Sequence, residues 1–136
     1  MTDTTKLIAG ILLISVPTIE FGGTFLLSIL SGEHSELTDF QRSMFRAGHA
    51  HAGVLVILAL VAQLFTDQAR LSAPVAWAVR IGFAADPILV SGGFFGAAMG
   101  SGRTRPGGLI GLVWFGVFVL GGSLIALGAG LIRARG

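Results

Sequence analysis

The chain contains no cysteine and little charge. Without cysteine it can form neither a disulfide nor a thiolate metal site. Charged residues make up 12% of its 136 residues, whereas a soluble domain carries about a quarter. The formal net charge of +2 is too small to indicate a nucleic-acid partner. These shortages argue against an ordinary soluble domain.

Long polar linkers are also missing, and apolar stretches fill most of the sequence. Hydrophobic residues make up 53% of the chain and the mean hydropathy is +0.84. Four stretches reach or nearly reach the ~20 residues that cross a ~30 Å hydrocarbon core. We therefore predict an all-α, integral membrane four-helix bundle. It forms a single transmembrane domain over residues 1–136, with spans at about 6–31, 39–66, 73–100 and 107–133.

Local signals indicate where these helices begin. Thr38 and Gln41 form a capping-box pattern ahead of the second span, and Pro74 falls in the first turn of the third. Lys6 ahead of an apolar run resembles the start of a signal peptide. The run continues past Glu20 without a small-residue cleavage site, so we expect a retained span.

Four spans place both termini on one side of the lipid bilayer. Basic residues set the orientation, and here they are nearly balanced between the two sides; we expect the termini in the cytoplasm. Small residues are dense in all four spans, as in the stretch 92–100. They let helices approach closely, either within one bundle or in a homo-oligomer or larger membrane complex.

Two segments of the chain share the pattern Pro-x-x-x-x-Gly-Gly-x-Phe. "PTIEFGGTF" begins at Pro17 in the first span, and "PILVSGGFF" begins at Pro87 in the third. Either a duplicated two-helix hairpin or a chance match in a glycine-rich chain explains the pattern. A duplication would be functionally asymmetric, because Glu20 corresponds to Val90.

Five ionisable side chains inside the predicted spans need an explanation: Glu20, His49, His51, Arg80 and Asp86. Such residues are functional-site candidates by default. At ~1.5 Å per helical residue, the histidines and Glu20 lie roughly 15–18 Å from the same side, and Asp86 lies near the middle of its span. We therefore predict a mid-membrane site with Glu20, His49, His51 and Asp86 as candidate metal ligands and the two histidines as candidate cofactor ligands.

Purely structural roles are also possible for these polar residues. Glu20 could be a protonated acid bonded to a neighbouring helix. Asp86 precedes Pro87, which disfavours helical geometry at the residue before it, so its carboxyl group could serve a kink. Arg80 lies nearer the membrane edge, and we expect it to snorkel.

The two histidines cannot readily share one ion. Residues two apart on a helix are separated by about 200° and face nearly opposite directions. We expect two half-sites, of which one faces Glu20 or Asp86 inside the bundle. The other faces a different helix pair, lipid or a second protomer.

Histidine with carboxylates suits iron, zinc or manganese. Haem iron takes one or two axial ligands, commonly histidine, and the small residues beside the histidines would leave room for a flat macrocycle. Chains of histidine and carboxylate at mid-membrane are also typical of proton relays.

The segment "RAGHAHAGVLVILAL", residues 46–60, resembles the His-x-His segment of haem–copper oxidase catalytic subunits. This resemblance implies haem with His49 or His51 as axial ligand. The whole chain resembles four-span membrane proteins of high-GC, actinobacterial-like bacteria, with "PTIEFGG" in the first span and "RAGHAHAG" in the second; that implies the bacterial plasma membrane. No other span contains histidine, so a bis-histidine haem would need another protomer or a second ligand type.

Three functions follow as hypotheses. The leading one is a haem- or metal-binding membrane protein that uses His49, His51 or both, with Glu20 as ligand or orienting partner. The alternatives are a proton-coupled channel or small transporter, and a non-catalytic accessory or assembly subunit of a membrane complex. Whether the protein is an enzyme stays open, although no spacing indicates a hydrolytic nucleophile.

Overall fold

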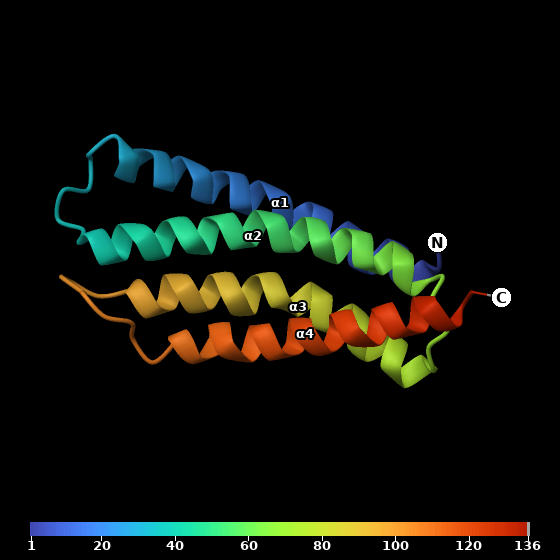
Figure 1. Ribbon diagram of the computed structural model, residues 1–136. Coiled ribbons are helices and arrows are strands. Elements are labelled where there is room, and N and C mark those ends of the chain that lie inside the picture. The colour runs from blue at the N-terminus through green and yellow to red at the C-terminus, as the bar shows by residue number, and fades with distance from the viewer. Residues whose placement is uncertain (136) are drawn as a thin grey trace.

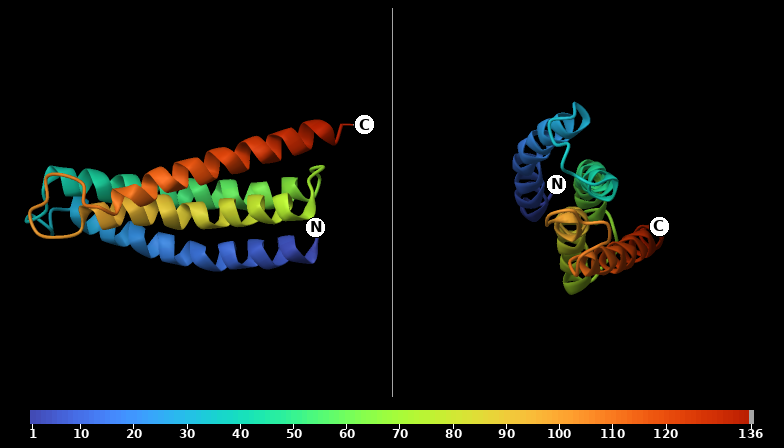
Figure 2. Two further views of the ribbon diagram at one scale, coloured as in Figure 1. Left: turned by 90° about the horizontal axis from the view of Figure 1, so that it is seen from below. Right: turned by 90° about the vertical axis from the view of Figure 1, so that its left-hand side faces the viewer.

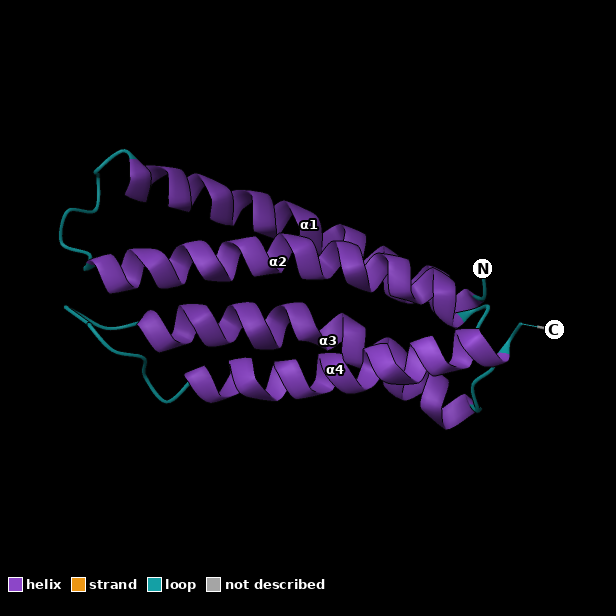
Figure 3. Ribbon diagram, in the orientation of Figure 1, coloured by secondary structure: helices purple, strands orange, loops and turns teal. Residues whose placement is uncertain are grey.

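The computed structural model describes residues 1–135 and contains four long helices (Figure 1). They are α1 (Asp3–Leu30), α2 (Asp39–Thr66), α3 (Ala73–Ala98) and α4 (Ile110–Arg133). The described residues contain no strand (Figure 3). Each helix is long and apolar enough to cross a membrane, which confirms the predicted all-α fold of a multi-pass membrane protein. The helix ends lie within three residues of the predicted spans.

The capping box at the start of α2 is present and has a second role. The Thr38 hydroxyl accepts from the Gln41 backbone N–H, and the Gln41 side-chain oxygen accepts from the Thr38 N–H. The same buried amide donates through Nε2 to the carbonyls of Ala98 and Gly100, at 2.9 and 2.7 Å. One side chain therefore begins α2 and ties it to the end of α3.

The helices form an open, curved row rather than a closed square. α2 and α3 pack together at the centre, α1 packs mainly on α2, and α4 packs mainly on α3. The end-on view in Figure 2 shows α1 and α4 on opposite sides of this pair, and within the described residues they do not touch. Their outward faces carry apolar side chains such as Ile14 and Phe118, which are more than three-quarters exposed and suit contact with lipid.

Glycines bring α3 and α4 close together. A Cβ atom at Gly93 would lie 2.8 Å from the backbone nitrogen of Val113, and one at Gly116 would lie 2.6 Å from Cγ2 of Val90. Neither position has room for a larger residue unless something shifts. The predicted close approach of backbones therefore occurs within the bundle, at the α3–α4 contact.

α3 changes direction near its middle (Figure 1), where Pro87 lies inside the helix. Proline has no N–H to donate, so the carbonyl of Phe83, four residues earlier, loses its helical hydrogen bond. Proline is a common cause of such a bend. The bend falls beside Asp86, one of the predicted site residues.

Candidate functional site

Arg80 is only 6% exposed, so the expectation that it snorkels to the membrane edge is wrong. Its guanidinium group donates to Asp67 Oδ1 at 2.6 Å, to Thr5 Oγ1 at 2.7 Å and to Gln63 Oε1 at 3.1 Å. These acceptors come from α1, α2 and the residue that ends α2. Because they replace water, the arginine has no need to reach the surface.

Asp67 completes this polar cluster. Besides Arg80, its carboxylate accepts from the Thr5 hydroxyl at 2.8 Å and from the Thr2 backbone N–H and hydroxyl, each at 2.9 Å. Burial alone would raise the pKa of Asp67, but the bonds from Thr2, Thr5 and Arg80 together hold that pKa well below its ordinary value of 3.8. The cluster joins three helices and has its groups paired, so we assign it a structural role.

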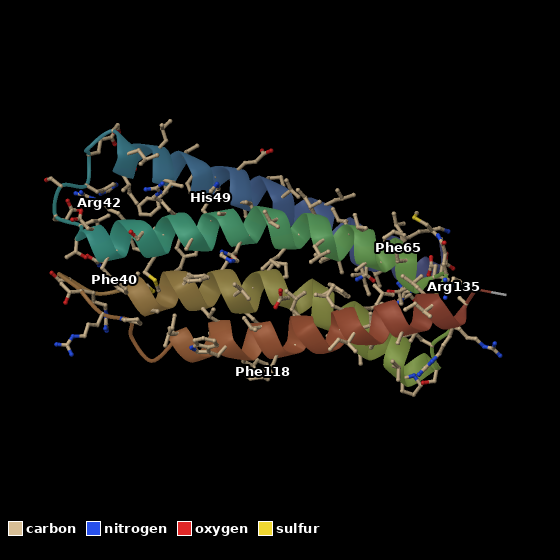
Figure 4. All side chains as sticks on the ribbon, in the orientation of Figure 1. Phe40, Arg42, His49, Phe65, Phe118 and Arg135 are labelled. Carbon is tan, nitrogen blue, oxygen red and sulfur yellow. The ribbon has the colours of Figure 1, made fainter. Side chains whose placement is uncertain are left out.

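His49 lies on the α1 side of α2, as Figure 4 shows. Two glycines of α1 leave room for its ring. A Cβ atom at Gly22 would lie 3.6 Å from His49 Nδ1, and one at Gly23 would lie 3.3 Å from Cε1. Glu20 lines the same cavity, of about 250 Å³, but the described residues show no hydrogen bond between Glu20 and His49. The side chain of Glu20 is exposed.

His51 faces the other way, toward α3 and α4. Its Nδ1 lies 2.7 Å from the carbonyl oxygen of Ala47. Because a carbonyl oxygen only accepts, Nδ1 carries a proton and Nε2 of the neutral ring keeps a free lone pair. The ring centroid lies 5.0 Å from that of Phe94. The two histidines therefore belong to different helix pairs, as the helical spacing requires.

The groove beside His51 is almost entirely apolar. It has a volume of about 430 Å³ and is formed by α2, α3 and α4. Among the described residues that line it, His51 is the only titratable one. The walls are aliphatic and aromatic, and include Leu55, Val90, Phe94, Val113, Trp114 and Val117.

Asp86 lies apart from both histidine cavities. It is 1% exposed, and within the described residues neither of its carboxyl oxygens has a hydrogen-bond partner. Oδ1 faces α4, where a Cβ atom added to Gly116 would lie 3.1 Å away. This is the reverse of Asp67, whose carboxylate is fully bonded.

The four predicted site residues do not form one cluster. Among residues 1–135 no group of three or more histidine, aspartate or glutamate side chains is placed to hold a metal ion. Glu20 and His49 share one cavity, while His51 and Asp86 each stand alone. Asp67 and the aromatic walls of the His51 groove were not identified from the sequence. The sequence feature that could have indicated Asp67 is its position at the end of α2, followed by Arg80 early in α3.

Comparison with known proteins leaves the function to be inferred from this geometry. No family model, no curated protein and no solved structure matches the chain. The resemblance of residues 46–60 to haem-binding segments therefore stays an expectation. The features that bear on function are the two histidine cavities and the unpaired carboxyl group of Asp86.

Proposed function

We propose that this protein binds haem in the membrane, with His51 as an axial ligand. The observation that supports this is the bond from His51 Nδ1 to the Ala47 carbonyl, which leaves Nε2 free beside the apolar groove. Ligating histidines usually donate their second N–H to a carbonyl or carboxylate, which fixes the tautomer and the ring orientation.

The apolar walls of the groove suit the porphyrin ring of haem. Its volume of about 430 Å³ falls within the ~300–1,000 Å³ of typical ligand cavities. Phe94 and Trp114 offer aromatic faces, and Leu55 and Val117 are among the aliphatic residues that would keep water from the ligand. Haem bound here would supply one-electron redox chemistry.

His49 is not equivalent to His51 in this proposal. Its ring packs on Gly22 and Gly23 and shares a smaller cavity with Glu20. No second histidine lines the His51 groove. Any further ligand to the haem would therefore be a small molecule or come from a second protomer. The resemblance to membrane proteins of high-GC bacteria supports a location in the bacterial plasma membrane.

Haem titration of the purified protein in detergent tests the proposal. We expect wild type and His49→Ala to bind haem with a Soret band and similar affinity, and His51→Ala to bind at least about tenfold more weakly. Added imidazole should restore the band in His51→Gly, because it can occupy the space that the side chain leaves. Equal binding by all three proteins, or a loss confined to His49→Ala, would overturn the assignment to His51.

A further inference from the structure

Asp86 lies at the middle of α3 and does not line the groove beside His51. It is the fourteenth of the 26 residues of that helix, so about 18–20 Å of helix separates it from either end. Its side chain is 1% exposed, and neither oxygen is hydrogen-bonded within the described residues. The Ser91 hydroxyl, five residues further along α3, is also buried and has no hydrogen-bond partner within residues 1–135.

Within the described residues Asp86 makes no ion pair and accepts no hydrogen bond. α4 has no titratable residue between Ile110 and Ile132. From α2, His51 is the titratable side chain within electrostatic reach of Asp86, but it makes no hydrogen bond to either carboxyl oxygen. The α1 residues that meet the centre of α3 are apolar or hydroxylic, such as Leu12 and Ser15 beside Pro87.

The comparison with Asp67 decides the charge state. Asp67 receives hydrogen bonds from three residues, one of them an arginine, and these stabilise an ionised carboxylate. Asp86 receives none. A buried carboxylate with no bond and no counter-ion is strongly disfavoured, and the group neutralises by keeping a proton. We propose that Asp86 is a proton-binding site and is a neutral carboxylic acid in this structure.

Release of that proton requires a change in the contact between α3 and α4. The O–H bond of Asp86 can break only if a water molecule reaches the carboxyl group to accept the proton. The close packing of α4 on α3 at Gly116, which has no Cβ atom, blocks the access of water to Asp86. Pro87, which follows Asp86 in α3, leaves the Phe83 carbonyl without its helical hydrogen bond. α3 can therefore bend here with little loss of free energy. Proton exchange at Asp86 is therefore linked to separation of α3 from α4.

Infrared spectroscopy of the protein in lipid bilayers tests this inference independently of haem. At neutral pH we expect a carboxylic C=O stretch at the high-frequency end of its range, as for an acid without hydrogen bonds. The band should be lost in Asp86→Asn and retained in Glu20→Gln. Its shift in deuterated water should be slow in wild type and in Gly121→Ala, where a Cβ atom meets nothing within 4 Å. It should be faster in Gly116→Ala.

A second measurement covers the case in which Asp86→Asn fails to fold. Labelling wild type with aspartate carrying ¹³C in its carboxyl group should lower the frequency of the same band, because the other three aspartates are exposed or ionised. Three results would each overturn the inference. They are the absence of a carboxylic band in wild type, a band whose frequency the aspartate label does not change, and a band that is lost only in Glu20→Gln. Equal deuterium shift rates in Gly116→Ala and Gly121→Ala would contradict the link to α3–α4 separation.

Discussion

At the scale of single residues, the hydrogen-bond partners of each polar side chain show whether it has a structural role or is free to bind a ligand or a proton. Arg80 and Asp67 satisfy each other with help from Thr5 and Gln63. His51 uses one ring nitrogen and leaves the other free. Asp86 has no partner within the described residues. The chain thus contains a paired polar cluster at one end and unpaired titratable groups near the middle of its helices.

Replacing Arg80 should destabilise the protein strongly. In Arg80→Met the partly buried carboxylate of Asp67 loses its arginine partner and keeps as its only charged partner the N-terminal amine, 3.9 Å away. Breaking a buried ion pair from one side costs about 3–5 kcal/mol, and we expect a loss towards the lower end of that range. Thermal unfolding in detergent, followed by circular dichroism, measures the change. The matched control is Arg70→Met, because Arg70 is exposed and should leave the Tm unchanged. Equal Tm values for the two variants would contradict the structural role of the cluster.

The same cluster should make stability depend on acidity. The pKa of Asp67 is lower in the folded protein than its ordinary value of 3.8. Its contribution to stability is therefore fully present well above that value and is lost as the pH falls below about 4. We expect the Tm of wild type to drop between pH 6 and pH 3 by more than that of Asp67→Asn. Asp39→Asn, at an exposed carboxylate, should behave as wild type; if Asp67→Asn does so too, this account of Asp67 is wrong.

The direction and environment of a side chain could be predicted from the sequence only where the geometry of its own helix determines them. The divergence of His49 and His51 follows from their spacing on one helix, and the structure shows it. Burial of Arg80 could not be predicted, because it depends on Asp67 thirteen residues earlier and on Thr5 from another helix. The state of Asp86 depends on the absence of partners, which no sequence pattern reveals.

At the scale of helices, the contact between α3 and α4 depends on individual glycines. In Gly93→Ala the new methyl group would lie 2.8 Å from the Val113 backbone nitrogen and 2.6 Å from its Cγ2 atom. Backbone cannot move aside as a side chain can, so we expect a loss of about 1–3 kcal/mol in the free energy of unfolding. Adjacent Gly92 has nothing within 4 Å, and Gly92→Ala should be neutral or stabilising by up to about 1 kcal/mol. Denaturation in mixed detergent compares the two, and a larger loss in Gly92→Ala would refute the packing described here.

Helix positions were predictable and helix contacts were not. Apolar length and the capping box at Thr38 were enough to place each helix within three residues. Each helix is apolar on most sides, so no stripe in the sequence marks the face that meets a neighbour. The glycine pairs of the two segments that share the Pro-x-x-x-x-Gly-Gly-x-Phe pattern illustrate this. Gly22 and Gly23 receive an imidazole ring, whereas Gly93 receives the backbone of another helix.

At the scale of the whole molecule, the open row of four helices predicts that the two loops between spans α1–α2 and α3–α4 lie on one side of the bilayer. The termini and the α2–α3 loop lie on the other. Since the chain has no cysteine, single cysteines can be introduced without a background. Ser35→Cys and Ser101→Cys should react with an impermeant maleimide from one side, and Gln68→Cys and Ala134→Cys from the opposite side.

Labelling of Ser35→Cys and Ala134→Cys from the same side of sealed vesicles would contradict the four-span topology. Agreement of Gln68→Cys with Ala134→Cys is the internal control, because both lie at the same end of the bundle. The experiment also shows which side faces the cytoplasm. The sequence alone gives a weak basis for that orientation, because its basic residues are nearly balanced between the two sides of the bilayer.

The measurement that tests the central proposal most directly is the visible absorption spectrum of the protein as isolated from haem-sufficient cells. We predict a Soret band in wild type and in His49→Ala, and its loss in His51→Ala at equal yield of folded protein. A colourless wild-type protein, or an unchanged Soret band in His51→Ala, would contradict the assignment of His51 as the haem ligand.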